Sequence, residues 1–297
     1  MNLFGLCSRG THRLTITRSE TTKRKFGCVL SGLRSFLSTR VCHLVFFALL
    51  AAVAFASRTR YRGSESLSHS GNFHAYYINL ASRPDRRTAV EQQLKMSGMT
   101  ARRVWASDVR GNQSLLDNCW NSEEKSICAG MIGVKYSHIR ALRLGLATGK
   151  DVAIFEDDFA WFPHTSPKYV LQAIAQVKSN FPNWKMILLS ANIVNKTPAV
   201  PPLELEISPV TRAMVVRLNN AGTTHGYIAK QTYIRKVLET FEACDVQQAR
   251  GNAIDHCWKP LQLVDEWYGF NPQLGTQAAG FSDIEGRNVN YEHFFRT

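Results

Sequence analysis

The chain has 297 residues and a formal net charge of +13, and this length allows one large α/β domain or two small ones with a sizeable core. Residues 1–62 contain 11 of the 36 Lys and Arg residues but only one of the 23 Asp and Glu residues, so the rest of the chain carries only +3. The basic charge therefore belongs to an N-terminal arm, and the folded part is not expected to bind nucleic acid.

A membrane anchor is predicted behind this arm. Residues 1–40 are basic and residues 41–56 are apolar, with 17 residues free of Lys, Arg, Asp and Glu between Arg40 and Arg58. As a helix such a segment spans roughly 26 Å, close to the hydrocarbon core of early secretory membranes. The preceding basic residues favour a cytoplasmic N-terminus. We therefore expect a single-pass type II protein of the Golgi or endoplasmic reticulum with a lumenal domain; a cleaved signal and an organelle transit peptide remain alternatives.

Residues 57–72 are polar and contain Gly and Ser, which indicates a short stem before a folded domain at residues 73–297. Four cysteines follow the stem: Cys119, Cys128, Cys244 and Cys257. Pairing of sequence neighbours, 119 with 128 and 244 with 257, is one of three connectivities, and buried free thiols are the alternative. Asn112 and Asn195 begin N-glycosylation patterns, which matter only in a secretory compartment.

The folded part opens with a strand, a basic turn and a helix. Ala75–Leu80 is predicted as the first strand, and Pro84 and Asp85 are placed to start a helix that stops at Gly98. The turn contains three arginines: Arg83, Arg86 and Arg87. Backbone N–H groups, the helix dipole and these arginines would meet at one strand end, which suits a diphosphate. A solvated basic turn is the alternative.

A second strand and a long helix are predicted next. Val104–Ala106 is the expected strand, ending at Asp108, and an irregular stretch follows from Val109 to Ala129. Gly130–Gly133 then introduces a helix that ends at Gly149. Two polar residues lie in the first half of this helix: Ser137 and His138.

The following strand ends in three adjacent carboxylates. Val152–Phe155 is too short and too β-branched for a helix, so we expect a buried strand of an α/β sheet. Glu156, Asp157 and Asp158 follow at its carboxyl end, where ligands bind in open α/β sheets. Residues i and i+2 of an extended chain point the same way, so Glu156 and Asp158 can face one ligand. Two such charges repel unless a cation lies between them, and Mg²⁺ or Mn²⁺ suits hard oxygen ligands; a solvated acidic turn is the alternative.

The rest of the chain alternates strands and helices. We expect a helix over 170–177, a strand at Met186–Leu189, a Pro-rich loop at 197–209, a strand at Ala213–Leu218, a flexible turn at Gly222–Gly226, a short strand at Tyr227–Ala229 and a helix over 234–241. Strands that alternate with helices imply a mostly parallel sheet, so the predicted class is α/β.

Several motifs occur in a recognisable order: Tyr77–Leu80 with Arg83–Arg87, Gly130–Gly133 with Ser137 and His138, Ile154–Asp158, Gly226–Ala229, Asp255, and Pro272–Leu274 with Gln277 and Phe281–Ile284. This order resembles the family 25 glycosyltransferases, which include lipooligosaccharide and procollagen galactosyltransferases. The resemblance covers about Phe73 to Gly286. Val134–Tyr136 and Asp108–Gly111 depart from the family pattern, which places small apolar residues at the first and a tighter Asp-Gly at the second.

The resemblance implies a GT-A-type nucleotide-sugar-binding fold, a UDP-sugar donor with galactose as the commonest sugar, and a divalent metal such as Mn²⁺. It also implies a glycan or protein hydroxyl as acceptor and inversion at the anomeric carbon. Glu156 and Asp158 would then hold metal and diphosphate, with Asp283 as a third metal ligand or substitute base. Nucleotide-sugar contacts would come from Asn79, Arg83, Arg86, Arg87, Asp108, Ser137 and His138. Asp255 is the expected base for the acceptor hydroxyl.

Two other functions remain open from the sequence. A relative that keeps the fold could be catalytically silent and serve as a glycan-binding or scaffolding protein. A metal-dependent phosphohydrolase acting on nucleotide sugars would also use an acidic strand end beside arginines. Retention of both carboxylates and of the arginine turn argues against the silent relative, and product analysis without an acceptor separates hydrolysis from transfer.

Overall fold

The computed structural model describes residues 73–120, 124–249 and 251–295. The predicted basic arm, membrane span and stem at residues 1–72 lie outside these ranges. Within them, no helix is both long and apolar enough to cross a membrane. The described residues thus correspond to the part of the chain predicted as a folded domain.

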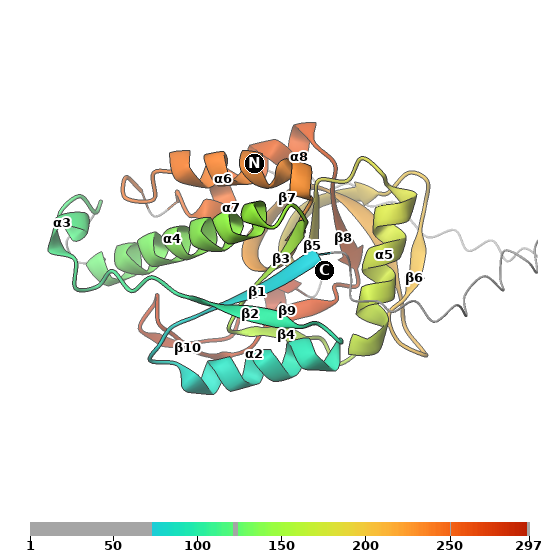
Figure 1. The fold of residues 1–297 in the computed structure, drawn as a ribbon, viewed down its shortest axis with the longest axis horizontal. Helices are drawn as coiled ribbons and strands as arrows, with labels where there is room; N and C mark the ends of the chain where they lie inside the picture. Colours follow the sequence, from blue (N-terminus) through green and yellow to red (C-terminus); the bar gives the residue numbers. More distant parts are fainter. Residues whose placement is uncertain (1–72, 121–123, 250, 296–297) are drawn as a thin grey trace, which may run out of the picture. The chain divides into compact units, whose positions relative to one another are not determined.

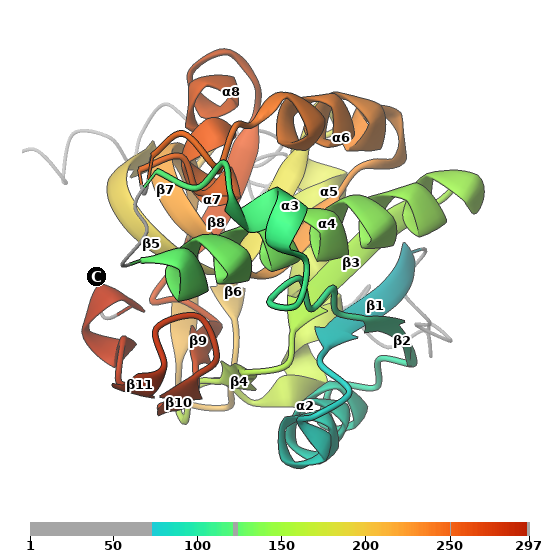
Figure 2. The same cartoon turned by 90° about the vertical axis from the view of Figure 1, so that its left-hand side faces the viewer.

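A seven-stranded sheet forms the centre of the domain (Figures 1 and 2). In spatial order the strands are β2 (Ala101–Trp105), β1 (Phe73–Asn79), β3 (Asp151–Glu156), β7 (Arg212–Ala229), β5 (Met186–Pro198) and β8 (Trp267–Asn271), with β6 (Glu204–Glu206) paired to β7. β1 is parallel to β2 and β3, and β5 is parallel to β8, whereas β7 is antiparallel to every strand it pairs with. The predicted α/β class with a mostly parallel sheet is confirmed.

Both faces of the sheet are buried, which explains why its central strand is apolar throughout. Val152–Phe155 of β3 has no exposed surface. Alternate residues of a strand point to opposite faces, so Val152 and Ile154 join one apolar cluster while Ala153 and Phe155 join another. Burial from both sides is the environment in which a short β-branched run forms a strand.

Helices cover the two faces of the sheet. One face carries α4 (Lys125–Ala147), α6 (Ile234–Ala243), α7 (Ile254–Cys257) and α8 (Lys259–Val264), and the other carries α2 (Pro84–Met96) and α5 (Val170–Asn180). The helices predicted to begin at Pro84 and to run through residues 170–177 and 234–241 are confirmed. Gly98 and Gly149 follow α2 and α4 with φ values of 73° and 67°, left-handed conformations with which helices commonly end.

Shorter elements complete the described chain. They are α3 (Gln113–Leu116), β4 (Phe159–Trp161) paired with β9 (Gly275–Gln277), β10 (Gly280–Ser282) paired with β11 (Arg287–Val289), and 3₁₀ turns at Pro167–Tyr169, Gln231–Tyr233 and Glu292–Phe295. The predicted Pro-rich loop at 197–209 is wrong in part, because Thr197 and Pro198 continue β5 and Glu204–Glu206 forms β6.

The long helix α4 begins earlier than the sequence predicts. Gly130 and Gly133 lie inside it and do not introduce it. A Cβ at Gly133 would lie 2.4 Å from the carbonyl oxygen of Ser107, and a Cβ at Gly130 would lie 2.8 Å from the side chain of Ile284. The two glycines therefore allow close packing of α4, against a cost in helix propensity of about 1 kcal/mol each.

The segment predicted as strand, flexible turn and short strand is one long strand, β7, with a bulge. Between the residues that pair with Ser190 and Asn192 of β5, β7 has three residues, 223–225, opposite the single residue Ala191. Thr223 has a φ of 73°, the one positive φ of a non-glycine residue in the described ranges. Such a conformation costs about 1–3 kcal/mol. Bulges are frequent beside functional sites, and residues 223–225 are called the β7 bulge below.

Two buried glutamines pair with the backbone on either side of this bulge. The side chain of Gln262 accepts a hydrogen bond from the N–H of Ala221 and donates one to its carbonyl, both at 2.8 Å. Gln273 does the same for Ala191, at 2.7 and 2.6 Å. Each amide takes the place of a neighbouring strand, because buried backbone groups must be paired. At Ala221 the ladder of β3 with β7 has already ended, at Gly226, and Ala191 has no partner residue in β7.

Replacing Gln262 with leucine is expected to lower the free energy of unfolding by about 1–3 kcal/mol, because the buried N–H of Ala221 would lose its acceptor. The carbonyl of Ala221 keeps the indole N–H of Trp258 as a donor at 3.3 Å. Urea denaturation of Gln262→Leu measures the loss, with Gln92→Leu on the exposed face of α2 as the matched control. Equal stability of the two variants would contradict the bracing role of Gln262.

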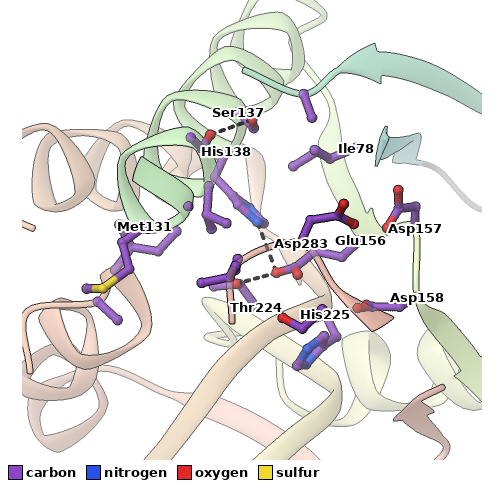
Figure 3. A pocket seen from close by; sticks show the side chains of 18 of the residues that line it. Ile78, Met131, Ser137, His138, Glu156, Asp157, Asp158, Thr224, His225 and Asp283 are labelled. Atoms are coloured by element: carbon purple, nitrogen blue, oxygen red, sulfur yellow. Dashed lines mark hydrogen bonds and ion pairs between the residues drawn. The ribbon is translucent and has the colours of Figure 1, made fainter. Parts of the chain in front are cut away.

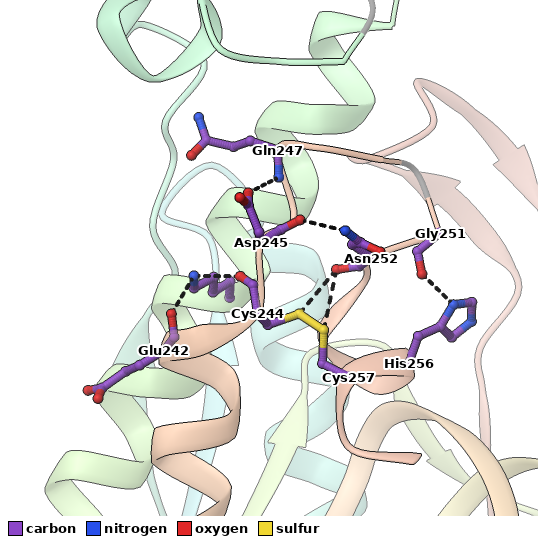
Figure 4. Close-up of a disulfide and its surroundings, with 9 residues drawn as sticks. Glu242, Cys244, Asp245, Gln247, Gly251, Asn252, His256 and Cys257 are labelled. Atoms are coloured by element: carbon purple, nitrogen blue, oxygen red, sulfur yellow. Dashed lines mark hydrogen bonds between the residues drawn. A yellow bond between two sulfur atoms is a disulfide. The ribbon is translucent and has the colours of Figure 1, made fainter. Parts of the chain in front are cut away.

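The cysteines pair as sequence neighbours, which is one of the three connectivities open from the sequence. One disulfide joins Cys119, after α3, to Cys128 in the first turn of α4, and the other joins Cys244, after α6, to Cys257 at the end of α7 (Figure 4). Free buried thiols at these positions are therefore excluded.

Candidate functional site

A cavity of about 520 Å³ lies at the carboxyl ends of β1 and β3. The segment after β2, α4, the β7 bulge, α7 and the segment after β10 contribute most of the rest of its wall. Of the sequence-predicted site residues, the wall contains Asn79, Arg86, Asp108, Ser137, His138, Glu156, Asp158, Asp255 and Asp283. Arg83 and Arg87 do not line it. A volume of this size is typical of a small-molecule site.

Three side chains of the types that bind metal ions meet on the wall of this cavity. Glu156 ends β3, Asp158 lies in the turn before β4, and His225 comes from the β7 bulge; one ligand atom of each lies within 4.8 Å of the others. The two carboxylates approach each other as the sequence predicts, although Asp158 lies in a turn and not in the extended chain that was expected. His225 joins them across the sheet, from a strand antiparallel to β3. These three residues are called the metal cluster below.

Glu156 is held by two side chains behind it. The hydroxyl of Thr224 donates to Oε1 of Glu156 at 2.5 Å, and Nε2 of His138 lies 3.3 Å from the same oxygen (Figure 3). Nδ1 of His138 lies 3.0 Å from the hydroxyl of Tyr227. Burial alone would raise the pKa of the Glu156 carboxyl, but the neighbouring imidazoles of His225 and His138 and the hydroxyl of Thr224 outweigh it and hold the pKa below its ordinary value. Glu156 is therefore ionised at neutral pH.

The metal cluster fits a divalent cation. Within the described ranges, Oδ1 of Asp158 and Nδ1 of His225 are buried and have no hydrogen-bond partner. Buried polar atoms of this kind are rare and require a partner. Carboxylates suit Mg²⁺ and Mn²⁺, and an imidazole moves the preference toward transition metals, so the three side chains together fit a divalent cation without selecting one ion.

Asp157, for which the sequence suggests no role, ties the acidic turn to β1 and α2. It accepts hydrogen bonds from Nδ2 of Asn79 at 2.7 Å and from Nη1 of Arg86 at 3.0 Å. Burial and the charge of Asp158 raise the pKa of the Asp157 carboxyl to about 6, against the opposing influence of Asn79 and Arg86. Asp157 thus positions the turn that carries its two neighbours.

This raised pKa predicts a pH dependence of stability in the metal-free protein. Asp157 keeps its proton to about pH 6 when folded but only to about pH 4 when unfolded. The folded state therefore binds more protons between these values, and the free energy of unfolding falls as pH rises through them, by at most about 3 kcal/mol. Urea denaturation of wild type and Asp157→Asn in EDTA, at about pH 4.5 and pH 7, should show wild type losing stability relative to the variant. A constant difference, or one of opposite sign, would contradict the assignment.

Arg86 is the arginine of the basic turn that reaches the cavity. Its Nη1 donates to Asp157 and Asp158 at 3.0 and 3.2 Å, and its Nη2 donates to the carbonyl of Phe281 at 2.7 Å. Gln277 also donates to Oδ2 of Asp158, at 3.0 Å. Arg86 therefore fixes the acidic turn to the C-terminal segment, residues 277–295.

The other two arginines do not line the cavity and are engaged in ion pairs. Arg83 forms ion pairs with Asp85 and Asp283, and Arg87 pairs with Glu91 one turn along α2. The three arginines thus diverge, because the first turn of α2 directs them to different sides. Only Arg86 of the three lies beside the acidic pair.

Two predicted acidic residues lie on the cavity wall in ion pairs. Asp283 is bound to Arg83, and His225 completes the metal cluster where Asp283 was expected as third ligand. Asp108 pairs with Arg110. Arg110 is thereby a second cation of the wall, one that the sequence does not single out.

The remaining predicted residues differ in how free they are to meet a ligand. The hydroxyl of Ser137 donates to the carbonyl of Gly133 at 2.6 Å and accepts the N–H of Ser107 at 2.8 Å, so it bridges α4 and the end of β2. Asn79 keeps Oδ1 buried and unpaired with any described residue, which leaves an acceptor at the cavity. Asp255 accepts the N–H of Thr223 with Oδ2 at 2.8 Å.

Thr224 and His225 are the functional residues that sequence reasoning misses. Gly222 and Gly226 flank them and indicate a flexible turn, which hides that the segment is a strand. A histidine next to a predicted strand is the signal that could have found them, since imidazole is the commonest metal ligand.

Comparison with known proteins leaves the chain unassigned. No family model and no curated protein matches it. Among solved structures, apo UDP-glucose pyrophosphorylase is similar with a TM-score of 0.36 and 9% identity, covering 75% of this chain and 96% of that chain. UDP-glucose pyrophosphorylase complexed with UDP-glucose gives 0.37 and 10%, covering 69% and 90%. 4-Diphosphocytidyl-2C-methyl-D-erythritol synthase from Anaerococcus prevotii gives 0.30 and 9%, covering 75% and 93%. Similarity of this degree assigns neither a family nor an activity.

Proposed function

We propose that the described domain is a metal-dependent inverting glycosyltransferase of the GT-A type, as the resemblance to family 25 implies. It would move a hexose, with galactose the first choice, from a UDP-sugar to a hydroxyl of a glycan or protein. The observation that carries the proposal is the metal cluster of Glu156, Asp158 and His225 in the wall of a cavity large enough for a nucleotide sugar.

The chain's own residues preorganise the donor end of this site. A divalent cation held by the cluster supplies the positive charge that a departing diphosphate requires. Thr224 and His138 orient Glu156, and Arg86 holds the turn that carries Asp158. Contacts of this kind to the ligands tune a metal site strongly. Arg110, which pairs with Asp108 on the cavity wall, would be a second cation near the phosphates.

The acceptor end requires a base. Asp255 lines the same cavity and is the residue we propose to take the proton of the acceptor hydroxyl as that oxygen bonds to the anomeric carbon. The bond from this carbon to the diphosphate breaks in the same step, which inverts the anomeric configuration. Asp283, held by Arg83, is the substitute if Asp255 is not the base.

The proposal includes a location. Two disulfides support a domain that matures in an oxidising compartment. We therefore propose that the domain lies in the lumen of the Golgi or endoplasmic reticulum, with residues 41–56 as the membrane anchor.

A donor screen of the full-length protein tests the proposal. UDP-sugars are offered with and without Mn²⁺ and with glycan and peptide acceptors, and released nucleotide and glycosylated product are measured. We expect UDP release that requires both Mn²⁺ and an acceptor. Cleavage of the donor at the same rate without acceptor would identify a phosphohydrolase, and absence of both products and of a UDP-induced thermal shift would identify a silent relative.

A further inference from the structure

The β7 bulge depends on a contact from another part of the chain. Thr223 is β-branched and has a left-handed backbone, which is strained. Its hydroxyl is buried without a described partner, so the side chain contributes nothing that would offset the strain. The N–H of Thr223, in contrast, donates to Oδ2 of Asp255 at 2.8 Å.

The residues around Asp255 leave room for its hydrogen bond with Thr223 and hold the carboxylate in place. A Cβ at Gly222 would lie 2.9 Å from Oδ2 of Asp255, so glycine allows the carboxylate to approach the backbone. Asp255 is the second residue of α7, between the buried Ile254 and the half-buried Cys257. Cys257 is bonded to Cys244 after α6 (Figure 4). The carboxylate is therefore carried by a short helix that is anchored on both sides.

The two residues that follow Thr223 are the ones that reach the acidic pair. Thr224 donates to Glu156 at 2.5 Å, and His225 supplies the third ligand of the metal cluster. Any change in φ at Thr223 rotates the chain after it. A relaxed backbone at this position would therefore move both side chains away from Glu156.

We propose that Asp255 is a positioning residue for the metal cluster. Its carboxylate holds Thr223 in the left-handed conformation and thereby aims Thr224 and His225 at the acidic pair. The inference rests on the proposed function in taking a divalent cation as the ligand of the cluster. It is separable from the role of Asp255 as base, because an amide oxygen can also accept the N–H of Thr223 but cannot take a proton.

The test measures the affinity of the full-length protein for Mn²⁺ alone by isothermal titration calorimetry. Asp255→Ala should weaken binding about 10–100-fold, the usual effect of losing a residue that orients a metal ligand. Asp255→Asn should retain the wild-type affinity. The double variant Asp255→Ala/Thr223→Gly should regain most of the loss, because glycine adopts a positive φ without the carboxylate. Asp245→Ala removes a carboxylate beside the same disulfide but outside the cavity wall, and should bind as wild type.

Three results would overturn the inference. They are wild-type affinity in Asp255→Ala, equal losses in the alanine and asparagine variants, and a double variant as weak as Asp255→Ala. If Asp255→Ala does not fold, the variant Gly222→Ala is measured in its stead, because the added methyl group crowds the Asp255 carboxylate. It is measured with and without Thr223→Gly. A wild-type protein that binds Mn²⁺ but transfers no sugar overturns the proposed function alone, and one without affinity for Mn²⁺ overturns both.

Discussion

Replacement of Asp158 with asparagine should lower the rate of metal-dependent sugar transfer by about a hundredfold or more, with the fold intact. The amide keeps the shape of the side chain and an acceptor for Gln277, but it removes the charge that faces Glu156 and His225. A neutral oxygen is a weaker ligand for Mn²⁺ than a carboxylate, and the cluster would retain one full negative charge. Initial rates at saturating Mn²⁺ and donor measure the effect.

The matched control is Asp117→Asn, which changes the same group at an exposed position outside the cavity wall. Its rate and its urea midpoint should equal those of the wild type. Addition of EDTA should abolish transfer by the wild type and leave the residual rate of Asp158→Asn unchanged. A near-normal rate for Asp158→Asn would rule out a metal role for this carboxylate.

The second large effect is expected for Asp255→Asn, in which transfer should fall about a hundredfold to ten-thousandfold, the usual contribution of a general base. The affinity for Mn²⁺ should stay unchanged, because the amide oxygen still accepts the N–H of Thr223. Transfer rates and Mn²⁺ titrations on the same preparation separate the two roles of this side chain.

If Asp255→Asn transfers sugar at the normal rate, the base lies elsewhere on the cavity wall. Asp283 would then be the next residue to substitute.

The sequence predicted correctly those helices and strands that are determined by their own residues. Val152–Phe155 is buried from both sides, and its composition indicates this without knowledge of its neighbours. Pro84 begins α2 because its fixed φ and missing N–H suit the first helical turn. Glu156 and Asp158 face one site as the period of a strand predicts, although it is the turn after β3 that carries Asp158 there. The acidic pair could therefore be predicted from the sequence.

The features that sequence reasoning misjudged have their causes in distant segments. Gly222 and Gly226 look like turn residues, yet a Cβ at Gly226 would lie 2.6 Å from the ring of Phe159, and one at Gly222 would meet Asp255. Both glycines serve close approach between segments far apart in the chain. Likewise, the partners of Arg83 and Arg86 include Asp283 and Phe281, which no local pattern connects to them. His225 reaches the site because β7 pairs with β3, which is also a contact between distant segments.

The C-terminal segment, residues 277–295, bears on the order in which the protein matures during synthesis. Ala278 donates its N–H to the carbonyl of Asp158 at 2.7 Å, Ile284 packs on Gly130, and the ring of Phe295 meets that of His225 edge-on. Chains are synthesised from the N-terminus, and domains fold as units. Every strand of the central sheet has therefore left the ribosome before the wall of the cavity is complete. Competence to hold a ligand waits for residues 277–295.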